Sequence, residues 1–537
     1  WKLKHVDEAA FRAVAEEVSG RDLSTFFAQW LHTTELYDYA VGRVKVGRAA
    51  VRDSAGQKLR EAGPWITRVE VLRKAPGRIP VEVAVVAEHD TAVVRAEGLA
   101  DREWVRVETR SRPKQVMVDP GMRTHDWNML DNRKRVGGLL SSLRPPPGTE
   151  FYLHPYFSTR SRRDHMTIGI HPTVWYNDAG GVTLGLRSQN DYLGRFEQNQ
   201  ALFSAGTGWA TDEDVKDFDF FLRVRNPVLL RRPNVSQTFD AFKFEGRYGA
   251  AATVEWSRRA HLSYGPVRTH RAIFQWVAVD NVRYLDPELY DNVGTVELRL
   301  ESGITNAPGK WKLSLLSSLG GGLNYNRDGL AASGRPDLDP FYFRGFLEGI
   351  ARRKLGSSTE LGMRGYLAAG LGGDDAAKQR QIYFQGADPL AQLNNPFLRS
   401  RGALLVRDDF HYHAAGGAGV RGVDPHVSTG ALAALNLELE QVLVTRPSSL
   451  FRELSLAAFT DLSHGLGGNA QPLTGERVRF LGDAGLGVRI RHKIGDTEFV
   501  TRFDIPLYVS EPALAQDRNG NDGEFAFRWT FSFQDAF

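Results

Sequence analysis

Residue patterns that could support catalysis are scarce in this sequence. A zinc peptidase motif needs His-Glu-x-x-His, in which the histidines bind zinc and the glutamate activates water, yet none of the 14 histidines is followed by Glu. A glycine-rich phosphate loop and a G-x-S-x-G nucleophile turn are also absent. His411 and His413 have no acidic or histidine partner at metal-binding spacing, so we interpret them as a solvated strand end. We expect no catalytic residue and no metal ligand in this chain.

Two acidic stretches and one basic position remain. The aspartates of GLGGDDAAK and the stretch Asp517 to Glu524 could suggest calcium, but the latter lacks the twelve-residue loop with its terminal bidentate glutamate. We interpret both as exposed loops. The stretch GGAGVRGVDP, Gly416 to Pro425, places a single arginine, Arg421, among glycines and small residues. The structural elements around this flexible stretch determine which residues Arg421 contacts.

The composition excludes several classes of protein. The 537 residues carry 68 Lys and Arg against 64 Asp and Glu, and these charges are interspersed, so nucleic acid is not an expected partner. The absence of cysteine excludes disulfides and thiolate metal sites, and it fits a bacterial envelope protein as well as a cytosolic one. No run of about 18 apolar residues could cross a bilayer as a helix. Trp1 looks like an internal start, left by processing or by a longer polypeptide.

The first part of the chain predicts a helical piece followed by a small β-domain. VDEAAFRAVAEEVSG has an apolar face at helical spacing and ends at Gly20, and RDLSTFFAQWLHTT predicts a second amphipathic helix. Short alternating segments bounded by Gly and Pro follow and predict strands. We therefore assign residues 1–42 to the helical end of a domain and 43–123 to a soluble β-domain. A charge run and a triple proline in 124–149 are typical of a linker.

Residues 150–537 predict a transmembrane β-barrel. Segments of about ten residues alternate apolar with polar or small side chains, and Gly, Asn and Asp turns separate them. In FDFFLRVR, four apolar residues from Phe218 to Val224 share one face and the charged residues share the other. A soluble sandwich would alternate in the same way, but aromatic residues at strand ends favour a barrel. At about 24 residues per strand and turn, we expect about sixteen antiparallel strands.

The end of the chain supports this prediction. In FAFRWTFSFQDAF the aromatic residues from Phe525 to Phe537 fall in one phase, and a soluble edge strand this apolar would aggregate. In a barrel, this strand closes against the first strand and its outer face meets lipid. Phe531, Phe533 and Phe537 also resemble the C-terminal signal by which outer-membrane proteins are presented to their assembly machinery. We therefore predict an all-β fold class. We expect the protein in the bacterial outer membrane, with lipid and the assembly machinery as partners.

Four segments of the barrel region occur in the same order as in a known family of barrels: AGVRGV, LNLELE, FTDLSHG and GLGVRIRHKIGDTEFVTRFDIP. They resemble the C-terminal barrel of the bacterial surface antigen family, which includes BamA-like and two-partner-secretion transporter barrels. The resemblance implies a long loop that folds into the lumen, where the arginine of its motif Val420-Arg421-Gly422 pairs with an acidic residue of the wall. Asp461 is the candidate partner, from the family's Phe-x-Asp-x-Gly, although a serine replaces the second glycine here. Asp504 is the alternative.

The N-terminal stretch FRAVAEEVSGRDLSTFFAQWLHTTELYDYAV, Phe11 to Val41, resembles the end of the catalytic domain of membrane alanyl aminopeptidases, a family of zinc metallopeptidases. The match weakens at TTELYDY, where relatives usually have Gly-x-Pro, while PKQVMVDPG and DWNMLDN resemble the close of the family's β-domain. The resemblance implies that the zinc ligands and the catalytic glutamate lie upstream of Trp1. We expect zinc only in such an upstream domain, and this chain alone is not the catalyst.

Two functions follow from these resemblances. The barrel could anchor or export a zinc-aminopeptidase-like domain that lies mostly upstream. Alternatively, the barrel could translocate or assemble polypeptide substrates, with the peptidase-like domain serving only to bind them. A purely structural role in an envelope complex is a third possibility.

Overall fold

The computed structural model describes residues 7–52, 58–137, 148–153, 164–177, 179–192, 199–211, 216–227, 234–259, 265–326, 338–371, 376–389, 411–446, 450–466, 480–494, 497–515 and 523–537. The chain divides into two compact units, the first running to Phe151 and the second holding most residues from Gly169 onward. Among the described residues, no helix is both long enough and apolar enough to cross a membrane.

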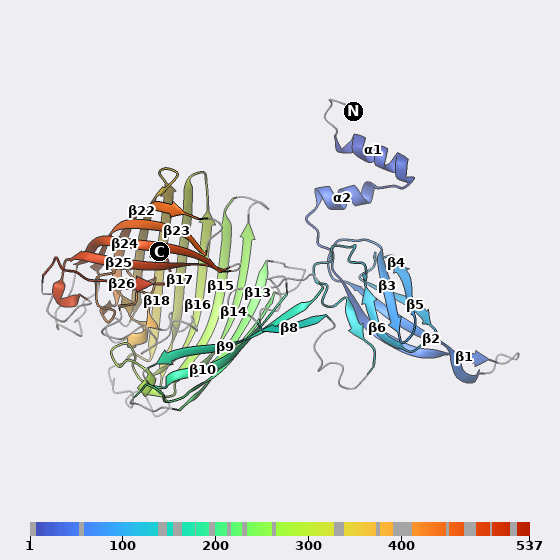
Figure 1. The fold of residues 1–537 in the computed structure, drawn as a ribbon, viewed down its shortest axis with the longest axis horizontal. Coiled ribbons are helices and arrows are strands. Elements are labelled where there is room, and N and C mark those ends of the chain that lie inside the picture. Colours follow the sequence, from blue (N-terminus) through green and yellow to red (C-terminus); the bar gives the residue numbers. More distant parts are fainter. Residues whose placement is uncertain are drawn as a thin grey trace. The chain divides into compact units, whose positions relative to one another are not determined.

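The N-terminal unit begins with two helices (Figure 1). Helix α1 (Glu8–Ser19) starts where the Asp7 carboxylate accepts a hydrogen bond from the Ala10 N–H, and it ends at Gly20, as the sequence predicts. Helix α2 (Ser24–His32) follows. No residue of α1 is buried. An isolated helix of this length is marginal in water, so the exposed apolar face of α1 is an unusual feature.

Two β-sheets follow the helices in this unit. The strands are β1 (Tyr39–Arg52), β2 (Lys58–Arg73), β3 (Val81–Ala87), β4 (Thr91–Ala96), β5 (Arg102–Thr109), β6 (Pro113–Val118) and β7 (Arg133–Arg135). They form sheets of order β1-β2-β5 and β4-β3-β6-β7. Alternating valines such as Val69, Val83 and Val116 are almost fully buried and form the core. Strand β7 and the buried Asp126 lie within the predicted linker 124–149, so the first half of that segment packs as part of the sheet domain.

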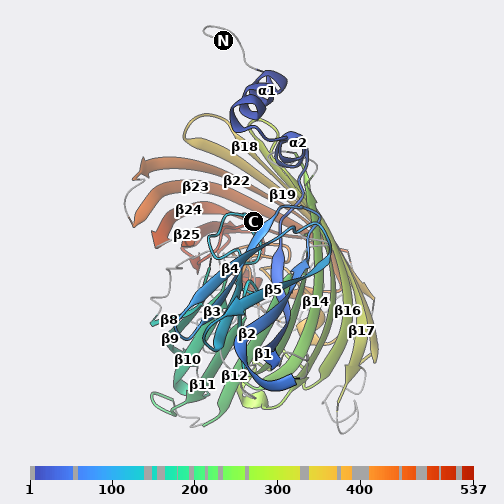
Figure 2. The ribbon, with the colours of Figure 1, turned by 90° about the vertical axis from the view of Figure 1, so that its right-hand side faces the viewer.

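Over the described residues, the second unit and the adjoining strand β8 form a closed β-barrel of 17 strands, which confirms the predicted fold class (Figure 2). Its strands are β8 (Thr149–Leu153), β9 (Met166–Asn177), β10 (Gly181–Asp191), β11 (Gln200–Gly206), β12 (Phe218–Pro227), β13 (Val235–Phe244), β14 (Arg247–Arg259), β15 (Val267–Val279), β16 (Gly294–Asn306), β17 (Trp311–Tyr325), β18 (Phe341–Lys354), β19 (Thr359–Leu371), β22 (Ala431–Thr445), β23 (Phe451–Gly465), β24 (Phe480–Ile494), β25 (Thr497–Val509) and β26 (Thr530–Ser532). Neighbouring strands from β10 to β19 and from β22 to β26 pair antiparallel.

The two faces of the wall differ in chemistry as the alternation predicts. On β12, Phe218, Leu222 and Val224 are exposed to the outside, whereas Asp219 is buried on the lumenal side. On β16, Leu298 and Leu300 are each 55% exposed to the outside. A closed barrel satisfies all backbone hydrogen bonds between strands, and an apolar outer face then requires lipid around it.

Two stretches between β19 and β22, residues 376–389 and 411–430, together form a body that we call the plug. It contains the short helix η5 (Lys378–Arg380) and the strands β20 (Ile382–Tyr383) and β21 (Ser428–Thr429), which pair with each other. Apolar residues of both stretches, including Ile382, Phe384 and Val420, form one core with wall residues such as Leu432. The plug therefore lies inside the barrel, against the lumenal face of the wall.

The end of the chain differs from the predicted closing strand. Strand β26 is only three residues long, and it pairs with β25 from Asp504↔Thr530 to Arg502↔Ser532. The main-chain N–H and C=O of Phe531 instead bond to His411 and His413 of the plug. These contacts explain why a long regular strand does not form, because a main-chain group bonded to the plug is unavailable to a barrel strand.

Candidate functional site

Arg421 lies at the centre of an ion-pair network between the plug and the wall. Its guanidinium lies 2.8 Å from Glu438 Oε2, 3.1 Å from Asp461 Oδ2 and 3.3 Å from Asp504 Oδ2. The three carboxylates come from β22, β23 and β25, and none of these side chains is more than 8% exposed. The guanidinium also stacks on the Phe459 ring, with 3.9 Å to its centroid. Burial alone would lower the pKa of Arg421, but the surrounding carboxylates outweigh it and raise this pKa, so the arginine stays charged.

The wall also binds the main chain on both sides of Arg421. The Gly422 N–H donates to Asp483 Oδ2 at 2.5 Å, and the Asn436 amide donates to the carbonyl oxygens of Ala418 and Gly419 at 3.0 and 3.2 Å. On β19, the Arg364 guanidinium donates to the Gly417 carbonyl at 2.8 Å. These side chains fix the backbone of the motif as well as its charge.

The glycines of the motif allow this close approach. At Gly422, an added Cβ would lie 2.7 Å from Val509 Cγ1 and 3.1 Å from Pro506 Cβ. Gly417 has a φ of +50°, and a Cβ there would lie 2.1 Å from the Gly386 carbonyl oxygen. The glycine-rich composition therefore serves tight packing against the wall and within the plug.

Two further arginines balance the acidic residues of the wall. Arg489 contacts Asp504 at 2.5 Å and Glu438 at 2.8 Å, and Arg502 contacts Asp504 at 3.1 Å. All of these groups are nearly inaccessible to water. Buried charges of this kind are tolerated only when each has an opposite charge and hydrogen bonds, so the network is stable only as a complete set.

The predicted motif of the lumenal loop and its two candidate acidic partners thus lie together. Val420 is buried in the plug core, Arg421 contacts both acidic candidates, Asp461 and Asp504, and Gly422 bonds to the wall. Sequence reasoning missed Glu438, Asp483, Asn436 and Arg489. Their signal was the lumenal phase of their strands, since residues at i and i+2 share a face, but the alternation alone did not identify which lumenal residues reach the plug.

His413 of the histidine pair is not at a solvated strand end, which corrects our interpretation for that residue. His413 is fully buried, with Nε2 2.9 Å from the Gln385 carbonyl oxygen and Nδ1 beside the Arg502 guanidinium. Burial, and then the charge of Arg502, lower the pKa of His413 well below its ordinary value. The ring is therefore neutral, and Nδ1 accepts from the arginine.

A third histidine connects the plug to the turn between β15 and β16. His426 Nδ1 lies 2.7 Å from Asp424 Oδ1, and Nε2 lies 3.1 Å from Asp286 Oδ2 of that turn. Burial favours the neutral ring, but the hydrogen bonds with Asp286 and Asp424 outweigh it and raise the pKa of His426 to about 10. The imidazolium thus bridges two carboxylates.

The predicted C-terminal signal residues lie in three different settings. Phe533 is 42% exposed, and Phe531 packs edge-on against the Tyr412 ring of the plug. Phe537 does not continue the outward phase. Its ring lies 5.4 Å from the guanidinium of Arg352, a lumenal residue of β18, and its carbonyl oxygen accepts from the same arginine. The contact with Arg352 explains this departure from the predicted alternation.

The N-terminal unit contains a buried carboxylate cluster. Asp38 is fully inaccessible, and neither of its carboxylate oxygens has a hydrogen-bond partner among the described residues. Asp126 is also buried, and Asp131 pairs with Lys74 nearby. Burial, and then the charge of Asp126, raise the pKa of Asp38 to about 9. Asp38 is therefore protonated at neutral pH.

Across the described part of the chain, no three His, Cys, Asp or Glu side chains are arranged so that they could hold a metal ion. The acidic stretches weighed for calcium, Asp374-Asp375 and Asp517 to Glu524, fall mainly outside the described residues. Zinc in an upstream peptidase-like domain stays a prediction.

The closed barrel with its apolar outer face and its plugged, charged lumen defines an outer-membrane-type β-barrel protein. No protein-family model and no curated protein matches the sequence. Among solved structures, the chain is similar to BamA from Haemophilus ducreyi lacking POTRA domains 1–3, at 14% identity and a TM-score of 0.36 over 68% of this chain and 69% of that one. It is also similar to CdiB from Escherichia coli, at 11% identity and a TM-score of 0.40 over 69% of this chain and 65% of that one. The chain thus spans about two thirds of the length of these proteins.

Proposed function

We propose that this protein moves polypeptide segments across or into the outer membrane through its plugged barrel. The observation that carries the proposal is a non-covalent plug, held by Arg421, beside a polar lumenal cavity. The resemblance of the sequence to the bacterial surface antigen family supports it as well.

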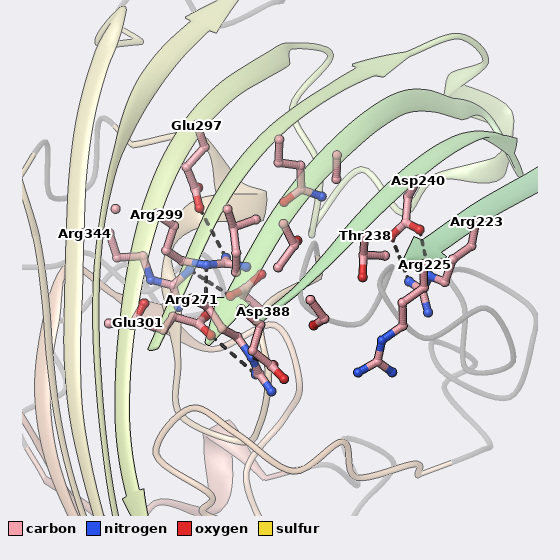
Figure 3. Close-up of a pocket in the computed structure, with 18 of the residues that line it drawn as sticks. Arg223, Arg225, Thr238, Asp240, Arg271, Glu297, Arg299, Glu301, Arg344 and Asp388 are labelled. Carbon is pink, nitrogen blue, oxygen red and sulfur yellow. Dashed lines mark hydrogen bonds and ion pairs between the residues drawn. The ribbon is translucent and has the colours of Figure 1, made fainter. Parts of the chain in front are cut away.

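The chemistry of the cavity suits such a substrate. It has a volume of about 650 Å³ and is lined mainly by charged and small polar side chains (Figure 3). Three of its arginines are paired with carboxylates of the same wall, as in the bidentate contact of Arg223 with Asp240 at 2.7 and 2.8 Å, and two more form ion pairs between the wall and the plug. Such a wall offers hydrogen bonds without a strong excess of either charge, so a polypeptide can bind and leave again.

The test is photocrosslinking in cells at two adjacent residues of β13. Thr238 lines the cavity, whereas Phe239 is 56% exposed on the outer face. A photoreactive residue in place of Thr238 is expected to form polypeptide adducts, and one in place of Phe239 is expected to form lipid adducts only. Absence of polypeptide adducts at Thr238 during growth would refute transport through the lumen.

A second function, anchorage of a zinc-aminopeptidase-like domain, is favoured by the exposed apolar face of the two helices. Phe11 is 60% and Val18 82% exposed on α1, while Phe26 and Trp30 are exposed on α2. We propose that a folded peptidase-like domain covers this face. The test is the zinc content and aminopeptidase activity of the natural polypeptide purified from outer membranes. Stoichiometric zinc with activity supports the anchor, and a metal-free, inactive polypeptide refutes it.

A further inference from the structure

The two stretches of the plug are bonded and packed against each other, so they do not form independent arms. The Phe384 N–H donates to the Val427 carbonyl oxygen at 3.0 Å, and the Val420 N–H donates to the Phe384 carbonyl oxygen at 2.9 Å. The same residues share the apolar core of the plug. Residues 376–389 therefore cannot leave the lumen without residues 411–430, and any movement is one of the whole plug.

This body is attached to two adjoining arcs of the wall by different contacts. On the arc of β19 and β22 to β25, the attachment is the Arg421 network together with the plug core. On the arc of β15 to β18, it comprises two ion pairs, a cluster of hydrogen bonds at the turn that precedes β16, and the contact of His426 with Asp286 of that turn. Arg380 of η5 contacts Glu297 of β16 at 2.5 Å, and Asp388 contacts Arg344 of β18 at 2.8 Å.

The turn cluster supports the same arc. Gln379 accepts from the Asp291 N–H at 3.0 Å, and its amide donates to the carbonyl oxygens of Asp291 and Val293 at 3.2 and 3.3 Å. This side also has apolar contacts, because Tyr383 of the plug lies in a buried cluster with residues such as Val277 and Leu289, and Ala377 lies in another with Val293. The ion pairs and hydrogen bonds are the part of the second attachment that water can replace.

The polar cavity lies along the arc that the second attachment closes. Its lining comes from β11 to β18 and from the plug residues Arg380 and Asp388, as Figure 3 shows for Asp388. Within the wall, Arg271 pairs with Glu255 at 2.5 Å, and Arg299 contacts Glu301 at 3.1 Å. The cavity is therefore a polar space between one face of the plug and a wall whose charges are already neutralised.

We propose that the substrate passage runs along the lumenal face of β11 to β18, and that the ion pairs Arg380–Glu297 and Arg344–Asp388 are its gate. The plug stays fixed to the other arc through Arg421 and tilts away from β16 and β18 when the gate opens. The proposal rests on the proposed transport function, because it names the path and the gating residues for that substrate. An extended polypeptide with polar side chains fits this path, since the cavity has charged and amide partners along its length.

The gate is tested by ion conductance of the purified full chain in planar bilayers, with no polypeptide present. Glu297→Gln removes the charge that holds Arg380, and we expect about a tenfold rise in open probability, which corresponds to about 1.4 kcal/mol. Glu453→Gln is the matched control, because Glu453 forms a lumenal ion pair with Arg491 at 3.0 Å, within the wall. An equal rise in both variants, or no rise in Glu297→Gln, overturns the gate. A second gate variant, Asp388→Asn, must behave like Glu297→Gln.

The position of the path is tested by thiol chemistry, for which the cysteine-free chain is a clean background. Both cysteine variants are made in the Glu297→Gln background. A cationic methanethiosulfonate reagent is expected to reduce the current through Thr238→Cys. The current through Glu453→Cys, which places the thiol on β23 in the other arc, is expected to stay unchanged. Reduction at Glu453→Cys but not at Thr238→Cys overturns the path. If the current behaves as expected but no polypeptide adduct forms at Thr238 in cells, the path stands and the proposed transport function fails.

Discussion

Replacing Arg421 tests whether the ion-pair network holds the plug. Arg421→Ala leaves Glu438, Asp461 and Asp504 buried with one positive charge fewer, and it also removes the stacking on Phe459. Breaking a buried ion pair by removal of one partner costs about 3–5 kcal/mol. If the plug opens as a body, its open population rises by about two to four orders of magnitude.

The assay is limited chymotrypsin digestion of the folded protein in detergent, read at Phe384. This residue is fully buried in the plug, so cleavage requires opening, and the cleavage rate follows the open population when reclosing is fast. Arg421→Lys keeps the charge but loses the fork of donors, so its rate should lie between those of Arg421→Ala and the unchanged protein. Arg223→Ala removes a lumenal arginine that pairs with Asp240 and has no plug contact among the described residues, so it should leave the rate unchanged. Equal rates in all four proteins would refute the reasoning.

Three further predictions concern other positions. Gly417→Ala should destabilise the plug by more than about 2 kcal/mol, because the site has a positive φ and the added Cβ would clash with the carbonyl oxygen of Gly386. Digestion at Phe384 should therefore accelerate. The folded pKa of Asp38 is raised to about 9, so its proton stabilises the N-terminal unit at low pH and this contribution is lost as pH rises from about 4 to 9. Asp38→Asn should therefore raise the free energy of unfolding of this unit at pH 7 by up to about 4 kcal/mol, measured as slower hydrogen exchange of the strands of the unit. The folded pKa of His426 is also raised, to about 10, so the stability that its charged ring gives the plug is lost as pH rises from about 6.5 to 10. Digestion of the plug should therefore accelerate over that range, and His426→Gln should abolish this pH dependence.

The alternation in the sequence determined the two faces of the wall. Phe218 and Val224 face outward and Asp219 inward, as predicted, because the side chains of a strand alternate with a period of two whatever the partner strand. The number of strands was also close, with about sixteen predicted and 17 in the described part of the chain, since strand length in a membrane is limited by the thickness of the hydrocarbon. Composition and local pattern were sufficient for these features because they arise from each strand separately.

The family resemblance of the sequence named Asp461 and Asp504 as alternative partners of Arg421, but the tertiary structure decided that both contact it together with Glu438. These three residues are far apart in the sequence, and only the register of β22 to β25 brings them to one guanidinium. Likewise, the C-terminal phase predicted an outward Phe537, but contacts with the plug and Arg352 redirect that segment. The sequence therefore determined which face each residue occupies, whereas closure of the barrel around the plug determined which lumenal charges meet, because those contacts join residues that no local pattern relates.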